Sequence, residues 1–226
     1  MRVLLPGYPQ VMAAIGDGET VMEDDTLFGG PGRVIRARAR DIELLALDAP
    51  HLFDREGRIY LGPDGRDWPD NPERFAALSW MAARIAKEGA ADWHPDILHG
   101  HDWQAGLAPY YLAKSGAGVP TILTIHNIAF HGAAPAGKLA ALRLDPSDFV
   151  SDGGFEFWGR INVLKAGLVW ADCITTVSPT YARELTRPEF GAGLDGVIRT
   201  RVTHLSGILN GIDTDTWNPA TDPAIA

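Results

Sequence analysis

Two short apolar segments, each ending in a cluster of polar residues, most constrain how this chain can fold. Residues 97–98 are apolar and lead into His99-Gly100-His101-Asp102, and the apolar run 121–125 leads into His126-Asn127. A segment long enough for one helix separates the two clusters. This order predicts successive parallel strands, and polar side chains at the carboxyl ends of parallel strands lie where open α/β sheets bind ligands. Imidazoles can exchange protons at neutral pH and carboxylates can stabilise positive charge, so we expect a functional site there.

The alternation of strand and helix patterns along the chain predicts the fold class. Strands separated by helices imply right-handed crossovers, so we expect an α/β fold: a three-layer, Rossmann-like domain with a mainly parallel sheet. One helix is expected to begin at Asn71, which can cap it, with Pro72 in its first turn. The expected strands are 2–5, 33–39, 42–47, 97–99, 121–125, 173–177 and 205–209, the helices 71–87, 105–114, 160–170, 179–185 (capped by Ser178) and 195–201, and the loops 6–18, 29–32, 57–69 and 132–137.

Composition and charge narrow the class of function. The 226 residues suffice for one large α/β domain or two small ones. The net charge of −9 argues against broad binding to nucleic acid or anionic membranes, and the sequence shows neither a membrane-spanning stretch nor a secretory signal. Cys173, the only cysteine, lies in the apolar run 173–177 and is predicted to be a reduced, buried strand residue. We therefore expect a cytoplasmic protein with no nucleic-acid or membrane partner.

Seven short segments resemble, in order, motifs of bacterial glycogen synthases and plant starch synthases. They are residues 4–9, 48–55, 101–106, 124–130, 163–168, 176–184 and 209–213. The resemblance extends from Leu4 to Pro219, nearly the whole chain. It implies the N-terminal half of a GT-B glycosyltransferase, an enzyme that transfers α-glucosyl units from ADP-glucose to the non-reducing end of an α-1,4-glucan with retention of configuration.

The same resemblance implies a domain organisation. Residues 1–213 match the first, catalytic domain of the family, incomplete at its N-terminus, and residues 214–226 match the start of an interdomain linker. The family's K-T-G-G-L loop and its second domain, which supplies an Arg/Lys pair for the diphosphate and a catalytic Glu, do not occur in these residues. We therefore expect a fragment that is inactive alone. Contacts to the base would lie mostly in the second domain, so this chain leaves ADP-glucose and UDP-glucose both open, and the scheme needs no cofactor or metal.

The family resemblance assigns five residues of this chain to the site. The resemblance places Asp102 beside the reacting sugar and His126 against the donor glucose, as the catalytic pair that supports positive charge on the sugar ring. It assigns Tyr60, Asn127 and Asn210 to substrate binding. Structural alternatives stay open: Asp102 could cap the following helix, His126 could be a core histidine, and the two asparagines could bond turn backbone.

The histidine cluster also allows a different class of function. His99-x-His101-Asp102 resembles the start of the H-x-H-x-D-H zinc motif of metal-dependent hydrolases, although no histidine follows the aspartate. On the synthase interpretation, His99 and His101 instead fix the strand end. Lys165 is expected to be structural, bonding backbone carbonyls.

A third alternative is a non-catalytic, glucan-binding remnant. Seven tryptophans occur in the chain, among them Trp68, Trp93 and Trp103, and indole rings can stack on sugars. Most tryptophans are expected to be packing residues.

Overall fold

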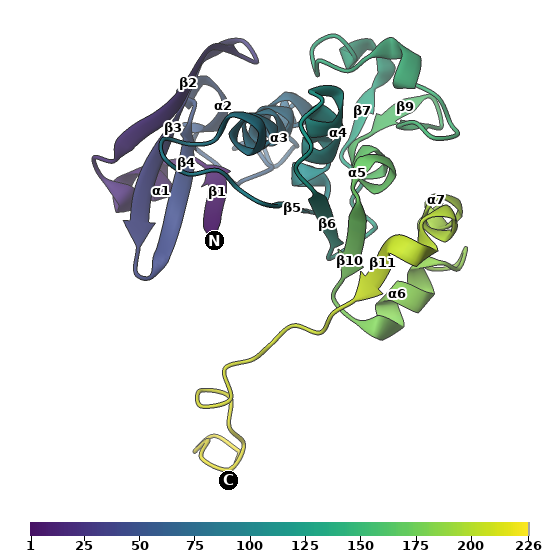
Figure 1. Cartoon of the computed structure of the whole chain (residues 1–226). Coiled ribbons are helices and arrows are strands. Elements are labelled where there is room, and N and C mark those ends of the chain that lie inside the picture. Colours follow the sequence, from purple (N-terminus) through teal and green to yellow (C-terminus); the bar gives the residue numbers. More distant parts are fainter. Residues whose placement is uncertain (226) are drawn as a thin grey trace.

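A computed structural model, which describes residues 1–225, arranges the chain as three sheets around a central group of helices (Figure 1). The N-terminal sheet has the strand order β1-β4-β3-β2, the second sheet β11-β10-β6-β5, and a small third sheet β7-β9-β8. The strands are β1 Arg2–Pro6, β2 Glu19–Leu27, β3 Gly30–Ala39, β4 Ile42–Asp48, β5 Leu98–His101, β6 Thr121–Ile125, β7 Ala133–Pro135, β8 Glu156–Phe157, β9 Arg160–Asn162, β10 Cys173–Thr176 and β11 Leu205–Gly207.

The second sheet is entirely parallel, which confirms the predicted α/β class with its parallel sheet. In this sheet β5 pairs with β6, and His101 lies opposite Thr124. The two polar clusters therefore lie at the carboxyl ends of neighbouring strands, at the same edge of the sheet, as the sequence predicts. In the N-terminal sheet β1 pairs with β4 in parallel, whereas β2, β3 and β4 form an antiparallel meander.

Helices α3, α4 and α5 pack side by side in the middle of the molecule and separate the N-terminal sheet from the other two (Figure 1). One apolar core lies between α3 and the N-terminal sheet, another around α4 and α5, and a third under β6 and β10. The helices are α1 Pro9–Ile15, α2 Pro50–Phe53, α3 Asn71–Glu88, α4 Leu107–Lys114, α5 Val163–Trp170, α6 Pro179–Leu185 and α7 Asp195–Thr200, with short 3-10 turns at Trp103–Ala105, Ala136–Lys138, Pro146–Asp148 and Val202–His204.

Several elements differ from the sequence prediction for identifiable reasons. Strand β2 is not predicted, because acidic residues interrupt its apolar pattern at the exposed edge of the sheet. The predicted helix 160–170 begins only at Val163, because the Asn162 side chain caps α5 by accepting a hydrogen bond from the Lys165 amide at 2.9 Å. Residues 160–162 form β9 instead. Helix α1 lies in the predicted loop 6–18, and β3 and β7 take up parts of the other Gly-containing loops.

Two predicted caps have opposite outcomes. Ser178 caps α6 as predicted, since its hydroxyl accepts a hydrogen bond from the Tyr181 amide at 2.9 Å. Helix α3, in contrast, starts at Asn71 itself, and its N-cap position, Asp70, makes no side-chain cap. The Asn71 side chain bonds a neighbouring loop instead, a contact that reaches the candidate site.

The prediction that Cys173 is buried is wrong, although the residue lies in a strand as predicted. Cys173 is exposed at the first position of β10 and forms no disulfide. Successive strand residues point to opposite faces, so the burial of Ile174 and Thr176 puts Cys173 on the other face.

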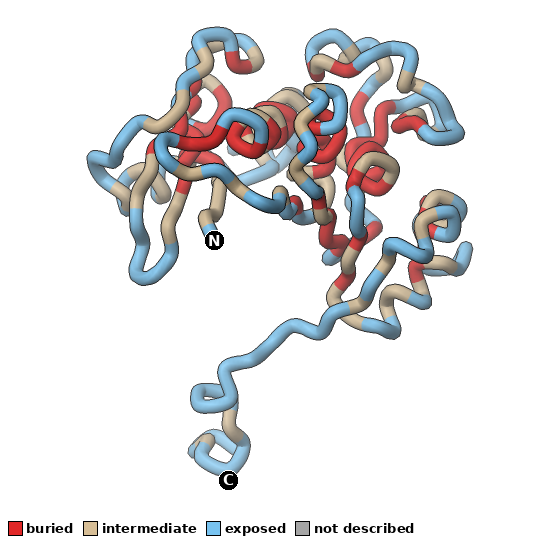
Figure 2. Tube along the Cα trace, viewed as in Figure 1, coloured by how far each residue is buried: buried red, intermediate tan, exposed pale blue. Residues whose placement is uncertain are grey.

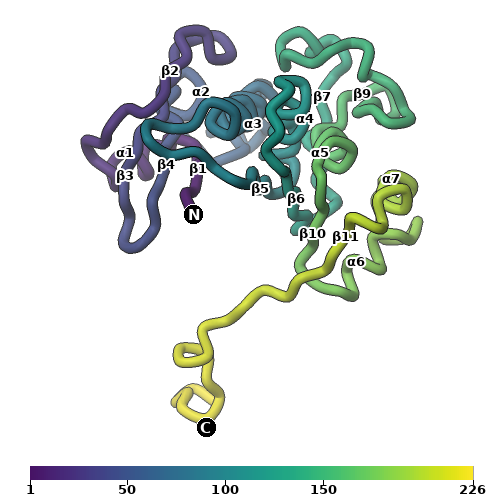
Figure 3. The backbone as a smooth tube through the Cα atoms, in the orientation of Figure 1, coloured from purple at the N-terminus to yellow at the C-terminus, as the bar shows by residue number. Residues whose placement is uncertain are grey.

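After β11 the chain leaves the body of the molecule in an extended, mostly exposed segment (Figures 2 and 3). This segment contains the predicted linker 214–226, of which Ala226 lies outside the described residues. Within residues 1–225, no helix has the length and apolar composition needed to cross a bilayer.

Candidate active site

A cleft of about 980 Å³ lies at the carboxyl ends of β5 and β6. The segments after both strands line it, and so does the loop between α2 and α3. Three residues predicted for the site, Tyr60, Asp102 and Asn127, face this cleft, although the first and the last are 67 positions apart in the sequence. The volume is within the range of small-molecule sites, roughly 300–1,000 Å³.

Asp102 connects the two strand ends. Its carboxylate atom Oδ1 accepts hydrogen bonds from the backbone amide of His126 at 2.7 Å and, at 3.4 Å, from that of Asn127. It makes no cap to the 3-10 turn that follows, so the helix-capping alternative is wrong. The backbone of Asp102 has φ 52° and ψ −165°, a conformation that costs an L residue about 1–3 kcal/mol. Strain of this kind persists where the surrounding contacts hold a side chain in place.

His126 is exposed at the end of β6 and belongs to a row of three imidazoles. Its Nε2 lies 3.0 Å from His101 Nδ1, so one ring donates a hydrogen bond and the other accepts it. The His101 ring stacks on that of His99 at 4.4 Å between centroids, and His99 Nε2 bonds the Thr124 hydroxyl at 2.6 Å. His99 and His101 thus fix the strand end, as predicted, and His101 also orients His126.

Two histidines of this row, His99 and His101, have pKa values below the usual range of a histidine. Burial, followed by the neighbouring imidazoles, lowers the pKa of both His99 and His101. The folded protein therefore favours their neutral forms, and the unfolded chain binds more protons below the unperturbed pKa of about 6.5.

The stability of the protein is accordingly expected to depend on pH in a defined window. The contribution of His99 and His101 is fully present above about pH 6.5 and is lost as the pH falls below that value toward their folded pKa. Urea unfolding between pH 8 and pH 5 should show a falling free energy of unfolding. His101→Asn should flatten this slope, whereas the substitution of exposed His204 by Asn should leave it unchanged. If the free energy of unfolding falls equally steeply with pH in both variants, the pH dependence does not come from His101.

Tyr60 reaches the cleft from a loop that buried polar groups hold in place. Its hydroxyl accepts a hydrogen bond from Gln104 Nε2 at 2.6 Å, and its ring lies 6.2 Å from that of Trp103. Behind the loop, Asn71 Nδ2 donates to the Tyr60 carbonyl at 3.0 Å, and Arg74 Nη1 donates to the Ile59 carbonyl at 2.8 Å. The position of Tyr60 is therefore set by the first turn of α3.

The two asparagines differ in position. Asn127 lines the cleft, and its Oδ1 accepts a hydrogen bond from the Ala129 amide at 3.0 Å, so it bonds turn backbone and still faces the site. Asn210 is exposed in the segment after β11 and does not line the cleft. The structure thus brings together Tyr60, Asp102 and Asn127, with His126 next to them, but not Asn210.

The cleft also contains residues that sequence reasoning did not assign to the site. Phe130 lines the cleft with a ring that is 61% exposed. Its place in the motif at residues 124–130 is the sequence feature that could have assigned it to the site. Lys138 is neutralised by Glu73, with 2.8 Å from Nζ to Oε2. Arg160 donates only to the Ala133 carbonyl at 3.4 Å, which leaves its charge toward the cleft, and no sequence pattern marks it.

Lys165 and the histidine cluster behave as structural groups. Lys165 Nζ donates to the carbonyls of Ser151 and Glu156, both at 2.6 Å, which confirms its predicted role. The Nε2 of His99 and the Nδ1 of His101 already have hydrogen-bond partners. In the described part of the chain no group of three or more His, Cys, Asp or Glu side chains is placed to hold a metal ion. The structure therefore offers no set of metal ligands for the hydrolase alternative.

Comparisons with known proteins identify the family and the fold. The model of a family described as "Starch synthase catalytic domain" matches residues 1–200. The chain is 60% identical over 220 residues to a glycogen synthase of Paracoccus denitrificans and 58% identical over 225 residues to one of Roseobacter denitrificans. These alignments cover 97% and 99% of this chain but 47% of each relative, so the chain spans about half the length of the curated relatives it matches.

A solved structure gives the same result for the fold. The structure is similar to the catalytic domain of Starch Synthase IV from Arabidopsis thaliana bound to ADP and acarbose, with a TM-score of 0.78 and 28% sequence identity. The match covers 98% of this chain and 46% of the plant chain.

Proposed function

Because this chain belongs to the starch synthase catalytic domain family, we propose that it is the N-terminal half of a glycogen synthase. The proposed reaction transfers α-glucosyl units from ADP-glucose to the non-reducing end of an α-1,4-glucan with retention of configuration. The fold is that of the N-terminal half of a GT-B glycosyltransferase. The main support for the proposal is the 2.7 Å hydrogen bond that Asp102 Oδ1 accepts from the His126 backbone amide beside the cleft.

The names of the relatives support the choice of substrates. The bacterial relatives are glycogen synthases, and the Arabidopsis structure is described as bound to ADP and acarbose. These descriptions favour an ADP-linked glucosyl donor over a UDP-linked one, and a glucan as acceptor. In this proposal residues 1–213 form the catalytic domain, residues 214–226 begin a linker, and the reaction takes place in the cytoplasm.

The residues of the cleft suggest how this chain contributes to the reaction. Asp102 uses Oδ1 for the two backbone amides, which leaves Oδ2 for the sugar ring as positive charge develops on it. His126 Nε2 is hydrogen-bonded to His101. The Nδ1 atom of His126 therefore remains available to a hydroxyl group of the donor glucose. Both groups are positioned before substrate binds, so the reaction needs little reorganisation of them. We assign Asp102 and His126 as catalytic residues and Tyr60 and Asn127 as substrate-binding residues. Asn210 lies outside the cleft, so its proposed role in substrate binding rests on the family resemblance alone.

A chimera tests the proposal. This chain replaces the part of the Paracoccus denitrificans relative that it matches over 220 residues, and the relative supplies the rest of its own length. The chimera is expected to incorporate glucose from ADP-glucose into glycogen. Asp102→Asn and His126→Ala should each lower turnover at least about tenfold, or about 1.4 kcal/mol of transition-state stabilisation, with a much smaller change in thermal stability.

Matched variants control this experiment. Asp41→Asn in the turn between β3 and β4, and His204→Ala, both at exposed positions, should keep the turnover of the parent chimera. If both site variants keep the turnover of the parent chimera, or if unfolding accounts for the whole loss of turnover, Asp102 and His126 have structural roles only.

A further inference from the structure

Residues 129–162, called the arm here, lie between β6 and α5 and form one wall of the active-site cleft. The arm includes the third sheet, in which β9 pairs with β7 and with β8. The opposite wall consists of the loop between α2 and α3 and the first turn of α3. The width of the cleft therefore depends on the contacts that hold the arm in place.

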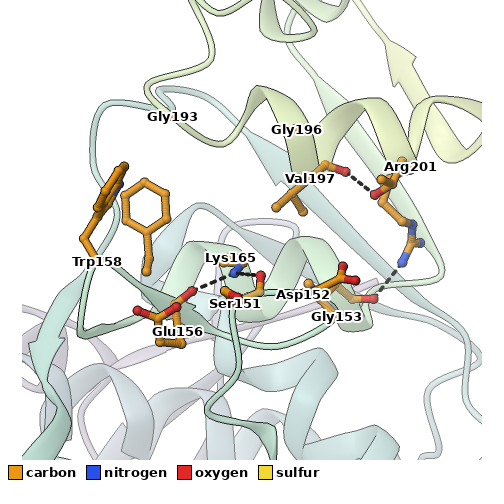
Figure 4. Close-up of a pocket in the computed structure, with 13 residues that line it drawn as sticks. Ser151, Asp152, Gly153, Glu156, Trp158, Lys165, Gly193, Gly196, Val197 and Arg201 are labelled. Atoms are coloured by element: carbon orange, nitrogen blue, oxygen red, sulfur yellow. Dashed lines mark hydrogen bonds between the residues drawn. The ribbon is translucent and has the colours of Figure 1, made fainter.

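Three lysines hold the arm at different points. Lys165 of α5 donates to two backbone carbonyls of the arm (Figure 4). Lys114 of α4 pairs with the Asp148 carboxylate of the arm at 2.6 Å. Lys138 belongs to the arm itself and pairs with Glu73 of α3. Of these three lysines, Lys138 is the one that lines the cleft.

Lys138 joins the two walls of the cleft directly. Its Nζ lies 2.8 Å from Glu73 Oε2 and donates to the Pro69 carbonyl at 3.1 Å, so one ammonium group connects the arm to α3 and to the loop before it. The side chains of Lys138 and Glu73 are 27% and 19% exposed. A charge pair that is partly shielded from water interacts more strongly than one at a fully exposed surface.

Aromatic rings lie on both walls that Lys138 joins. Trp68, directly before Pro69, lines one wall, and Phe130, 61% exposed, lines the other. Flat aromatic faces pack well against the C–H faces of a sugar ring. Contacts of this kind weaken steeply when the two surfaces move apart, because a gap of about 0.5–1 Å already loses a quarter to a half of the dispersion energy. The affinity for a sugar chain is therefore sensitive to the separation of the walls.

We propose that Lys138 is a positioning residue, which acts through Glu73 and the Pro69 carbonyl to hold the two walls at the spacing that an acceptor glucan needs to contact both. The identity of the acceptor rests on the proposed function. Because Glu73 neutralises the ammonium group, Lys138 contributes through the position of the walls and not through attraction of the donor phosphates.

The first test measures the walls themselves by hydrogen exchange in residues 1–226, without any substrate. Lys138→Met is expected to speed amide exchange at least about tenfold on both sides of the contact, in residues 66–73 and 133–142. Lys114→Met is the matched control, because it removes a lysine–carboxylate pair from the same arm outside the cleft. It should leave exchange in residues 66–73 unchanged. Equal effects of the two variants there, or no effect of either, overturn the proposal.

The second test measures kinetics in the chimera. Lys138→Met and Glu73→Gln should each raise the KM for glycogen about fivefold or more and leave kcat within about twofold of the parent. Glu73 does not line the cleft, so an equal effect of its substitution indicates a role through position. The double variant should raise the KM no further than either single change. Lys114→Met should leave both constants unchanged.

A reversed pair separates positioning from direct contact. Lys138→Glu combined with Glu73→Lys should restore most of the parent KM, because the two walls are again joined by opposite charges. A higher KM in Lys138→Met that Glu73→Gln does not reproduce and the reversed pair does not relieve overturns the positioning role, since the ammonium group itself would then contact substrate. A parent chimera without turnover overturns the proposed function and the choice of glucan with it, whereas hydrogen exchange still decides whether Lys138 holds the walls together.

Discussion

Arg74→Met is expected to lower the free energy of unfolding by about 3 kcal/mol or more. Arg74 is 1% exposed, and its guanidinium donates to the Leu52 and Ile59 carbonyls and to Asn71 Oδ1 at 2.7–2.8 Å. Methionine fills much of the same volume but leaves these three acceptors without a donor. Each unsatisfied buried acceptor costs about 1–3 kcal/mol. Chemical denaturation followed by circular dichroism measures the loss.

The same substitution should release the Tyr60 loop before the rest of the protein unfolds. Limited proteolysis is expected to cut residues 55–69 faster in the Arg74 variant, because this side chain and Asn71 hold the loop against α3. Arg84→Met, on the same helix, is the matched control. Arg84 is partly exposed, pairs with Glu88 at 2.8 Å and donates to the Glu23 carbonyl at 3.0 Å; water can solvate these partners once the side chain is removed, so its loss should cost about 1 kcal/mol. Equal losses in the two variants would show that burial of Arg74 is not what stabilises the loop.

The parts of the site that depend on strand ends were predictable from the sequence. Apolar runs that end in polar clusters locate β5 and β6, and parallel pairing then brings Asp102 beside His126. Periodicity also predicts α3, α4 and α6, because each helix has an apolar stripe that faces a core. Local patterns of this kind need no knowledge of distant contacts.

Contacts between distant segments were not predictable in the same way. The bond between Gln104 and Tyr60 joins residues 44 positions apart, and no local pattern indicates it. As a charged residue of an amphipathic helix, Arg74 would be expected at the surface. It is instead buried, because its guanidinium donates hydrogen bonds to carbonyl groups of neighbouring segments. Arg160 comes to the cleft only because Asn162 delays the start of α5 and leaves β9 as a strand.

Charge and exposure limit what this chain can do alone in the proposed reaction. The chain carries a net charge of −9, and Asp67 and Asp102 line the cleft. Of the two cleft cations, Lys138 is paired with Glu73, which leaves Arg160 as the counterion for a donor diphosphate in the described part of the chain. His126 and Asn127 are exposed to solvent, so water competes with the acceptor hydroxyl.

Residues 1–226 alone are therefore expected not to elongate glycogen. Their ADP-glucose-dependent incorporation should lie at least about 1,000-fold below that of the chimera, equivalent to about 4 kcal/mol of transition-state stabilisation. One wall of a cleft cannot both neutralise the leaving diphosphate and exclude water from the reacting sugar. Circular dichroism should first show that the chain is folded. Synthase turnover comparable to the chimera would mean that the walls formed by Tyr60, Asp102 and Asn127 suffice, and that a closed, two-sided site is not needed for this transfer.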